Sequence, residues 1–304
     1  MYLEYYLNKL DYSNMPNFLK KYLSVPSLNR LKKIGYFCGM DYASKDIYNF
    51  SEHITRYDHS VTVALITYKL TKDKTKTLAG LFHDIATPCF SHVIDYMNKD
   101  YDVQESTEEF TEKIILNDKL LLKYLKEDNI NVEDIINFKK FSIVDNNRPK
   151  VCADRIDGVI LNGFGWTKSV NLNDIKNIID DIILINNESN EEEIGFLTED
   201  IAKRVIDISK IIDIYCHSKD DNYMMEYLAK ITKYSIKKGY IKYDDLYILN
   251  EEEIFYILKN SNDYLLNELI NKFETMKKED IELIELPKIK IRNIKPIVNS
   301  KRIE

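Results

Sequence analysis

The sequence contains little glycine and little proline, with 8 Gly and 6 Pro in 304 residues. Barrels and sandwiches built on many tight turns need more of both residues. We therefore expect helices joined by short polar loops. The chain is long enough to bury a substantial core, and its 44% hydrophobic and 31% charged residues are ordinary for a soluble globular protein.

Cysteine is also scarce, and no long apolar run is present. The four cysteines, Cys38, Cys89, Cys152 and Cys216, form no CxxC pair, a pattern typical of free thiols in a reducing compartment. No stretch approaches the ~20 apolar residues that span a bilayer. The N-terminus has acidic and polar residues where a signal peptide needs an apolar run. These absences predict a cytoplasmic protein without a membrane segment.

The net charge of the chain gives no support for binding to a polyanion such as a nucleic acid. A formal net charge of −7 gives no overall attraction to a polyanion, so nothing in it supports nucleic-acid binding. A phosphorylated substrate would have to meet local cations or a metal ion.

Apolar residues recur at helical spacing along most of the chain. Gly239 is expected to end one helix, and Ser106 with Glu109 to form a capping box at the start of another. Alternating apolar and basic residues over 286–298 indicate one or two short strands. The expected fold class is all-α, with a helical core over 1–175, a helical extension over 176–304 packed on it, and a short C-terminal β segment. Helices are expected over residues 27–42, 56–70, 76–86, 90–99, 106–126, 151–165, 192–217, 220–239, 244–260 and 263–278.

Candidate metal ligands are concentrated in a few histidines and aspartates. His59 is expected in the first turn of its helix, His83 and Asp84 near the end of the next helix, and Asp154 on a later apolar helix. These side chains converge if the first two helices pack antiparallel. Imidazole with carboxylate suits Zn, Mn, Fe, Ni or Mg and leaves positions open for water and a phosphate oxygen. Alternatively, each residue is an ordinary core or surface side chain, but burying adjacent His and Asp needs compensation, which favours a metal site.

Three segments resemble the HD-domain metal-dependent phosphohydrolases: TRYDHSVTVALI, LAGLFHDIATPCFSH and CADRIDGVI. They are most similar to the deoxynucleoside triphosphate triphosphohydrolase (dGTPase-like) branch, with its TRFEHS, LLHDIGHGPFSH and DADRLDYL. The segments SLNRLKKIGYF and YCHSKDDNYMMEYLAKI extend the resemblance over roughly residues 24–260. It implies an HD-domain helical core, hydrolysis of a nucleotide phosphate ester and assembly as a homo-oligomer. Position by position, it implies His59, His83, Asp84 and Asp154 as ligands of a divalent metal.

Further site residues follow from the same resemblance. His92 and Asp95 match the catalytic histidine and its carboxylate partner, and their i, i+3 spacing lets the carboxylate orient the imidazole. Arg56 matches an arginine that contacts phosphate. Asn29 stands where the branch has a glutamine near the sugar, and Tyr215 matches a tyrosine that lines the nucleotide pocket.

The departures from the branch affect residues other than the metal ligands. Thr87 and Thr107 replace histidines, so a second catalytic imidazole is missing. Gly158 and Asn162 stand in place of the tyrosine and aspartate that recognise deoxyribose, and Asp207 in place of an arginine aimed at the distal phosphates. The expected function is hydrolysis of a nucleotide phosphate ester. The alternatives are a nucleotide phosphomonoesterase or phosphodiesterase, and a catalytically weak nucleotide-binding regulatory module.

Overall fold

Helix α4 (Arg56–Thr71) lies at the centre of the computed structural model, which describes residues 1–102, 104, 106–282 and 288–304. The start of α4 is set by a capping box between Thr55 and Asp58. The Thr55 side chain accepts a hydrogen bond from the Asp58 N–H, and the Asp58 carboxylate accepts one from the Thr55 N–H at 2.8 Å. This reciprocal capping box satisfies two donors that the helix leaves unpaired. Residues 59–67 of α4 are all buried, so the helix runs through the core.

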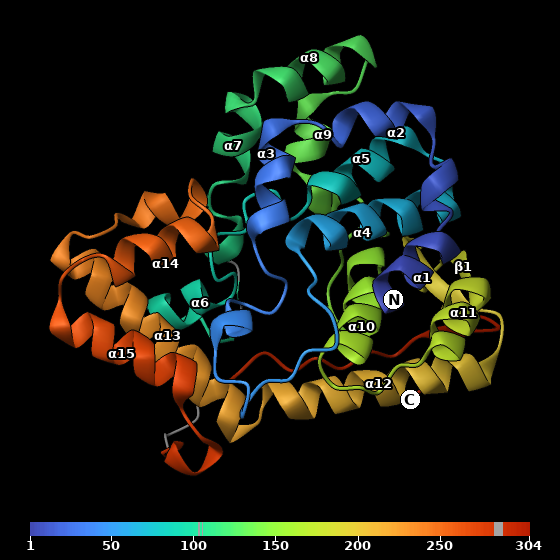
Figure 1. Cartoon of the computed structure of the whole chain (residues 1–304). Helices are drawn as coiled ribbons and strands as arrows, with labels where there is room; N and C mark the ends of the chain where they lie inside the picture. The colour runs from blue at the N-terminus through green and yellow to red at the C-terminus, as the bar shows by residue number, and fades with distance from the viewer. Residues whose placement is uncertain (103, 105, 283–287) are drawn as a thin grey trace.

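The other helices are arranged around α4. Helices α5 (Lys74–Phe82) and α10 (Ala153–Gly165) pack directly against it. Figure 1 shows α7, α8 and α9 at one end, α13, α14 and α15 grouped with α6, and the long α12 beside α10 and α11. The remaining helices are α1 (Tyr2–Lys9), α2 (Asn17–Tyr22), α3 (Pro26–Arg30), α6 (Val93–Asn98), α7 (Thr111–Asn117), α8 (Lys119–Glu127), α9 (Val132–Ile136), α11 (Leu172–Asp181), α12 (Glu199–Cys216), α13 (Lys219–Lys238), α14 (Glu251–Lys259) and α15 (Tyr264–Thr275). Short 3₁₀ turns are η1 (Tyr12–Asn14), η2 (Leu31–Lys33), η3 (Met40–Tyr42), η4 (Ser106–Glu108), η5 (Phe138–Lys140), η6 (Tyr243–Tyr247) and η7 (Lys278–Asp280).

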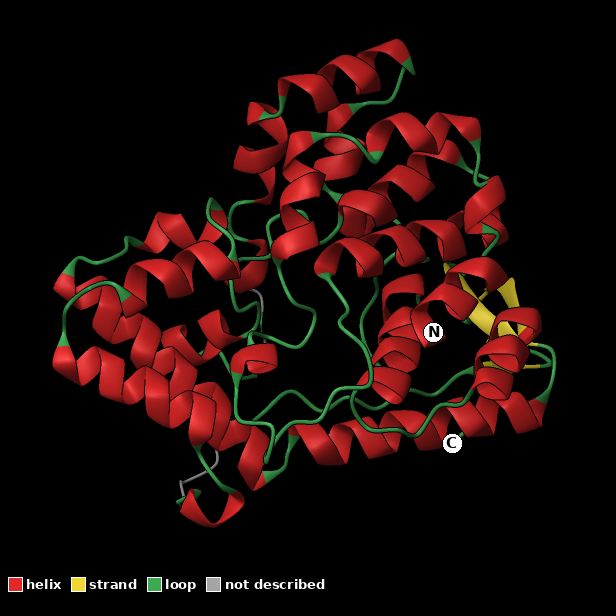
Figure 2. Ribbon diagram, in the orientation of Figure 1, coloured by secondary structure: helices red, strands yellow, loops and turns green. Residues whose placement is uncertain are grey.

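A small sheet makes the fold mostly helical rather than strictly all-α (Figure 2). Its strand order is β1-β2-β3-β4, with β1 (Ile182–Asn186) antiparallel to β2 (Glu192–Phe196), β2 parallel to β3 (Ile297–Val298), and β3 antiparallel to β4 (Lys301–Arg302). The expected helix over 192–217 therefore begins only at Glu199. Gly195 disfavours a helix, and a Cβ there would lie 2.9 Å from Ile185 of the facing strand. The Ile185 side chain thus packs directly against the glycine.

Other expected elements are shorter than the periodicity suggested. The expected helix over 27–42 ends early because the backbone of Ile34 and Tyr36 bonds instead to the segment before α4, with Tyr36 N donating to Ile54 O at 2.9 Å and Arg56 N to Ile34 O at 2.9 Å. The expected helix over 106–126 is split at Asp118, whose carboxylate caps α8. The expected capping box of Ser106 and Glu109 was wrong, because Ser106 lies in the 3₁₀ turn η4 and α7 begins after Phe110 without a side-chain cap. By contrast, α13 ends at Gly239 (φ 76°), as expected.

The C-terminal segment returns to the centre of the molecule. We call residues 288–298 the C-terminal strap. It runs beside α12, where Ser209 Oγ donates to the Arg292 carbonyl at 2.8 Å and Asp213 accepts from the Arg292 N–H at 2.6 Å. Only its last two residues, in β3, are strand, and residues 286 and 287 of the expected strand region lie outside the described residues. Among the described helices, none has the length and apolar character needed to cross a membrane.

Candidate metal centre

Two buried imidazoles face each other where α4 begins and α5 ends. The side chains of His59 and His83 are 3% and 4% exposed, and their ring centroids lie 5.1 Å apart. Only two residues join α4 to α5, so the chain turns back and the start of one helix lies beside the end of the other. This is the antiparallel packing that the sequence required for the two histidines to meet.

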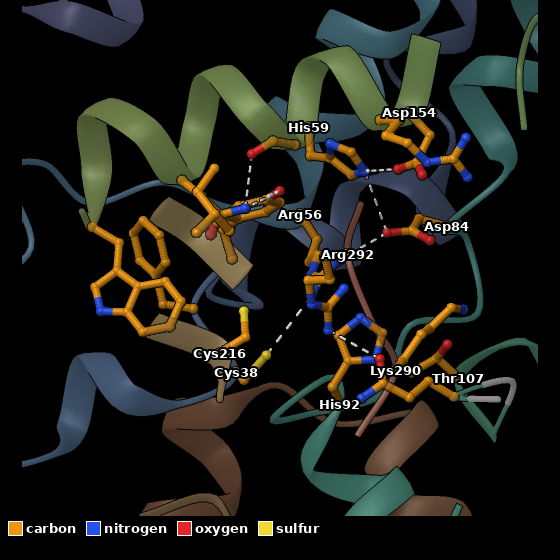
Figure 3. Close-up of a pocket in the computed structure, with 18 of the residues that line it drawn as sticks. Cys38, Arg56, His59, Asp84, His92, Thr107, Asp154, Cys216, Lys290 and Arg292 are labelled. Carbon is orange, nitrogen blue, oxygen red and sulfur yellow. Dashed lines mark hydrogen bonds and ion pairs between the residues drawn. The ribbon is translucent and has the colours of Figure 1, made fainter. Parts of the chain in front are cut away.

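Two carboxylates complete the cluster (Figure 3). Asp154 Oδ1, from the first turn of α10, lies 3.1 Å from His59 Nε2 and 3.5 Å from His83 Nε2. The carboxylate oxygens of Asp84 lie 3.7 Å from each of the same nitrogens. His59, His83 and Asp154 each offer one ligand atom, and these three atoms lie within 4.8 Å of one another. The cluster fits a metal site, and the four residues named from the sequence converge in it.

The hydrogen bonds behind the imidazoles orient both rings. His83 Nδ1 donates to the Gly80 carbonyl at 2.8 Å, and His59 Nδ1 donates to the Asp157 carboxylate at 2.6 Å. A carbonyl and a carboxylate can only accept, so each Nδ1 carries a proton and each Nε2 faces the cluster, where it can bind a metal once it has lost its own proton. Asp157 is fully buried and also accepts a hydrogen bond from the Tyr6 hydroxyl at 2.6 Å.

Charge within the cluster is balanced by protons when no cation is present. Burial opposes the charged form of His59, but its hydrogen bonds to Asp154 and Asp157 raise its pKa to about 10. Burial would raise the pKa of Asp84, but the positive charges of His83 and Arg56 lower it to about 2. A divalent cation bound here would take the place of the protons on the imidazoles.

Arg56 belongs to the same cluster. Its guanidinium donates to Asp84 at 3.0 Å and to Ser91 Oγ at 3.1 Å, and it lies over the Tyr36 ring at 5.0 Å from the centroid. The residue is buried. Arg56 therefore holds Asp84 in place and brings positive charge to the edge of the cluster.

The expected catalytic pair is formed at the start of α6. His92 Nδ1 lies 2.8 Å from Asp95 Oδ2, in an i, i+3 pair. The Asp95 side chain is fully buried, whereas that of His92 is 28% exposed. The carboxylate therefore fixes the imidazole from behind, and His92 lines the same cavity as the metal cluster.

That cavity has a volume of ≈ 260 Å³ and connects three chemically different walls. One wall carries the metal cluster and His92. Another is aromatic, and its Phe37 and Phe50 rings stack at 4.1 Å. A third carries basic side chains, contributed by Arg148, Lys290 and Arg292.

Comparison with known proteins agrees with this geometry. The HD domain family model matches residues 56–160. This segment is an HD domain. It contains His59, His83, Asp84 and Asp154, and such domains define a superfamily of metal-dependent hydrolases that bind divalent metals. The chain is also similar to the uncharacterized protein YdhJ of Bacillus subtilis (strain 168), with 24% identity over 252 residues, 81% of this chain and 74% of that protein.

Two residues expected to bind substrate lie outside the cavity of the HD domain. The Asn29 side chain donates to the Ser24 carbonyl at 2.8 Å and is not part of the cavity wall. Tyr215 is 41% exposed and packs edge-on against Trp166, with centroids 5.5 Å apart. Trp166 itself lines the cavity, so Tyr215 supports the wall from behind.

The positions that depart from the triphosphohydrolase branch divide into two groups. Thr107, Gly158 and Asn162 line the cavity, where they would face a bound molecule. Thr87 and Asp207 do not line it. The cavity wall itself therefore differs from the branch at the three positions that face inward.

Several functional candidates were missed at the sequence level. One feature of the sequence could have identified Asp157. It follows Asp154 by three residues on an apolar helix, so the two side chains lie on the same face. Tyr6 gave none among the 22 tyrosines. Lys290 and Arg292 were read only as part of a basic strand pattern, because nothing local indicates that the segment returns to the HD domain.

Proposed function

We propose that this chain is a metal-dependent phosphohydrolase that hydrolyses a phosphate ester of a nucleotide, with the metal held by His59, His83, Asp84 and Asp154. One observation carries the proposal. His83 Nε2 is buried and has no hydrogen-bond partner among the described residues, and the carboxylate oxygens of Asp154 and Asp84 lie 3.5 and 3.7 Å away. A buried polar atom without a partner is costly, and a cation between these groups removes that cost.

The donor set fits a divalent metal ion. Two imidazoles and two carboxylates suit Mn, Fe, Ni or Zn, and the carboxylates also suit Mg. When bound, such an ion polarises a phosphoryl oxygen and lowers the pKa of a coordinated water. The Asp154 side chain is 36% exposed, so the cluster is open toward the cavity from that side.

The remaining site residues serve proton transfer and charge. His92, held by Asp95 through Nδ1, has its other ring nitrogen available to donate a proton to the leaving oxygen of the ester. Arg56 sets the orientation of Asp84 and offsets negative charge on the phosphoryl group. These roles are proposals based on the contacts of each side chain and on the resemblance to the HD-domain phosphohydrolases.

An aromatic wall supports a nucleotide as the organic part of the substrate. Phe37, Phe50, Tyr48 and Trp166 line the cavity, and a nucleobase stacks well on such rings. The inward-facing Gly158 and Asn162 replace the deoxyribose readers of the triphosphohydrolase branch. They favour a second candidate, a phosphomonoesterase or phosphodiesterase acting on a nucleotide other than a deoxynucleoside triphosphate.

A substrate panel tests the proposal. The purified protein is assayed with nucleoside triphosphates, deoxynucleoside triphosphates, monophosphates and cyclic nucleotides in the presence of Mn²⁺, Ni²⁺ or Mg²⁺. We expect hydrolysis of at least one class, lost in the His83→Ala/Asp84→Ala variant and retained in His53→Ala, whose side chain is 68% exposed. Equal activity of the double variant and the wild type would exclude the proposed site. Metal and nucleotide binding without hydrolysis would instead support the regulatory-module alternative.

A further inference from the structure

The cavity has a basic wall that the proposed metal chemistry does not use. Arg148 lies just before α10, while Lys290 and Arg292 come from the C-terminal strap, and all three line the cavity. In Figure 3, Lys290 lies near His92 and Thr107, away from His59 and Asp154, and Arg292 is labelled between these two groups. The strap thus brings two cations to the HD domain from a position more than a hundred residues later in the chain.

The strap is held at several points, so its cations are fixed in place. Lys290 N donates to Tyr101 O at 3.1 Å, and Lys295 N donates to Pro149 O at 2.9 Å. The Arg292 backbone is bound on both sides by Ser209 and Asp213 of α12.

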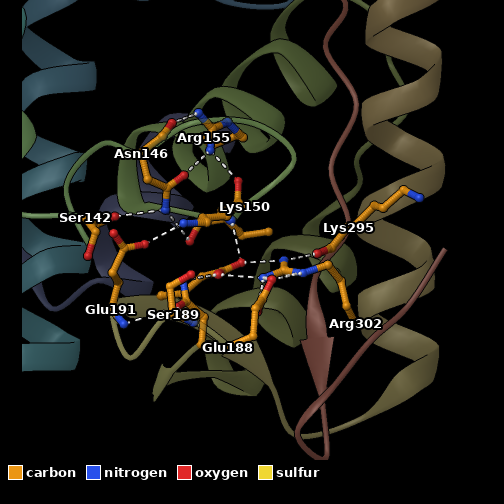
Figure 4. A network of polar contacts seen from close by, with 12 residues as sticks. Ser142, Asn146, Lys150, Arg155, Glu188, Ser189, Glu191, Lys295 and Arg302 are labelled. Carbon is orange, nitrogen blue, oxygen red and sulfur yellow. Dashed lines mark hydrogen bonds and ion pairs between the residues drawn. The ribbon is translucent and has the colours of Figure 1, made fainter.

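Beyond the strap, the chain end is tied to the sheet (Figure 4). Arg302 donates to Glu193 at 2.9 Å and to Glu188 at 2.7 Å. Glu193 is fully buried and also accepts from Val151 N at 2.9 Å, directly before α10. Because Arg302 also donates to the Lys295 carbonyl of the strap at 2.6 Å, one network connects the strap to the helix that carries Asp154.

The two arginines of this wall bond to neutral acceptors. Among the described residues, Arg148 and Arg292 form no ion pair with a carboxylate, in contrast to Arg56, which pairs with Asp84. The side chain of Arg148 donates to Asn293 O at 3.1 Å, and that of Arg292 donates to Gln104 Oε1 at 3.0 Å, both neutral acceptors. Arg292 Nε is buried and has no hydrogen-bond partner in the part of the chain that the structure describes.

The cations also act on one another and on the metal cluster. Burial, together with the charges of Arg292 and Arg148, lowers the pKa of the Lys290 amine. Burial and the charge of Arg155 lower the pKa of Arg148 to about 10. The Asp154 carboxylate acts on both Lys290 and Arg148 in the opposite direction, so the basic wall lies within electrostatic reach of the metal cluster.

We infer that Arg148, Lys290 and Arg292 form an anion subsite that binds a second anionic group of the substrate, beyond the phosphoryl group at the metal cluster. The inference rests on the proposed function. Guanidinium groups bind phosphate oxygens through paired, charge-assisted hydrogen bonds. A second phosphate would supply the acceptors that Arg148 and Arg292 lack. The substrate is therefore a compound with at least two linked anionic groups, and the strap determines this preference.

The test compares substrates with one and two phosphate groups. The wild type, Arg292→Gln and Arg148→Gln are assayed with matched nucleoside mono- and diphosphates, and Lys295→Gln is the control because it removes an exposed strap cation paired with Glu304. We expect each arginine variant to lower kcat/KM for the diphosphate roughly 10- to 100-fold, mainly through KM, with little change for the monophosphate. Metal content and thermal unfolding are measured for every variant.

A binding measurement separates this inference from the proposed function. Calorimetry measures the affinity of inorganic pyrophosphate and of inorganic phosphate for the metal-loaded wild type and variants. Preferential pyrophosphate binding that both arginine variants lose supports the subsite even if no nucleotide is hydrolysed, and then only the proposed function fails. If the variants fold and keep the wild-type preference between compounds with one and two phosphate groups, in hydrolysis or in binding, the proposed subsite is wrong. The proposed phosphohydrolase function is then unaffected. If Arg292→Gln does not fold, the Arg148→Gln variant tests the subsite instead. It is expected to fold, because among the described residues the Arg148 side chain is bound only to the Asn293 carbonyl of the strap.

Discussion

Replacing Asp157 by asparagine tests whether the residue behind His59 prepares the cluster for metal. Asp157 Oδ2 lies 2.6 Å from His59 Nδ1, and its Oδ1 accepts from the Tyr6 hydroxyl at 2.6 Å. Asparagine keeps the shape of the side chain but offers His59 a neutral oxygen. Charge-assisted hydrogen bonds are about twice as strong as neutral ones, so the ring becomes less firmly oriented and Nε2 a weaker donor to metal.

The expected magnitude follows from similar partners of metal-binding histidines. Removing such a partner lowers metal affinity about 10- to 100-fold, which corresponds to about 1.4 to 2.8 kcal/mol. The fold should survive, because the amide still fills the buried space and can bond to both neighbours. The assay is calorimetric titration of Mn²⁺ or Zn²⁺ into protein stripped of metal by a chelator, with thermal unfolding measured in parallel.

A matched control is available in Asp181. This residue is also buried and accepts two hydrogen bonds, from Thr198 N at 3.1 Å and Thr198 Oγ1 at 2.9 Å, outside the metal cluster. Asp181→Asn should change stability to a similar degree and leave metal affinity unchanged. The reasoning is refuted if Asp157→Asn binds metal as tightly as the wild type, or if the control loses as much affinity.

Two further predictions address the catalytic pair and the chain end. Replacing His92 by glutamine should lower kcat about 10²- to 10⁴-fold without changing metal content, because in the proposed mechanism the residue donates a proton and does not bind the metal. A parallel loss of metal in elemental analysis would contradict that role. Arg302→Met should lower the free energy of unfolding in urea by about 2 to 3 kcal/mol, because it leaves the buried Glu193 carboxylate without its cation. The loss is moderated because Glu193 keeps its hydrogen bonds to Val151 and Asn187. Lys301→Met, on the exposed neighbouring residue, should be nearly neutral, and equal effects of the two variants would exclude this reading of Glu193.

The sequence was most informative where the site is built from neighbouring helices. The helices that carry His59 and Asp154 were predicted with nearly the observed bounds, whereas the helix expected over 76–86 ends at Phe82, directly before His83. The spacing of His59 and of the adjacent His83 and Asp84 predicted that they meet if the two helices pack antiparallel, and the resemblance to the HD-domain phosphohydrolases strengthened that prediction.

Features that depend on distant parts of the chain could not be predicted. In the β1–β2 hairpin the Ile185 side chain packs directly against Gly195, a contact between strands that periodicity does not encode. The segment after Ile34 leaves the expected helix because its backbone bonds to residues before α4. The return of Arg292 to the cavity depends on anchors in α12, and no pattern around Arg292 indicates them.

The most direct test of the central claim is the metal content of the protein. The wild type, His83→Ala/Asp84→Ala and the surface control His53→Ala are exposed to a mixture of divalent metals, dialysed and measured by elemental analysis. We expect a stoichiometric divalent metal in the wild type and in the control, and its loss from the double variant. A folded double variant that retains the metal, or a wild type that binds none, would contradict the proposed metal centre.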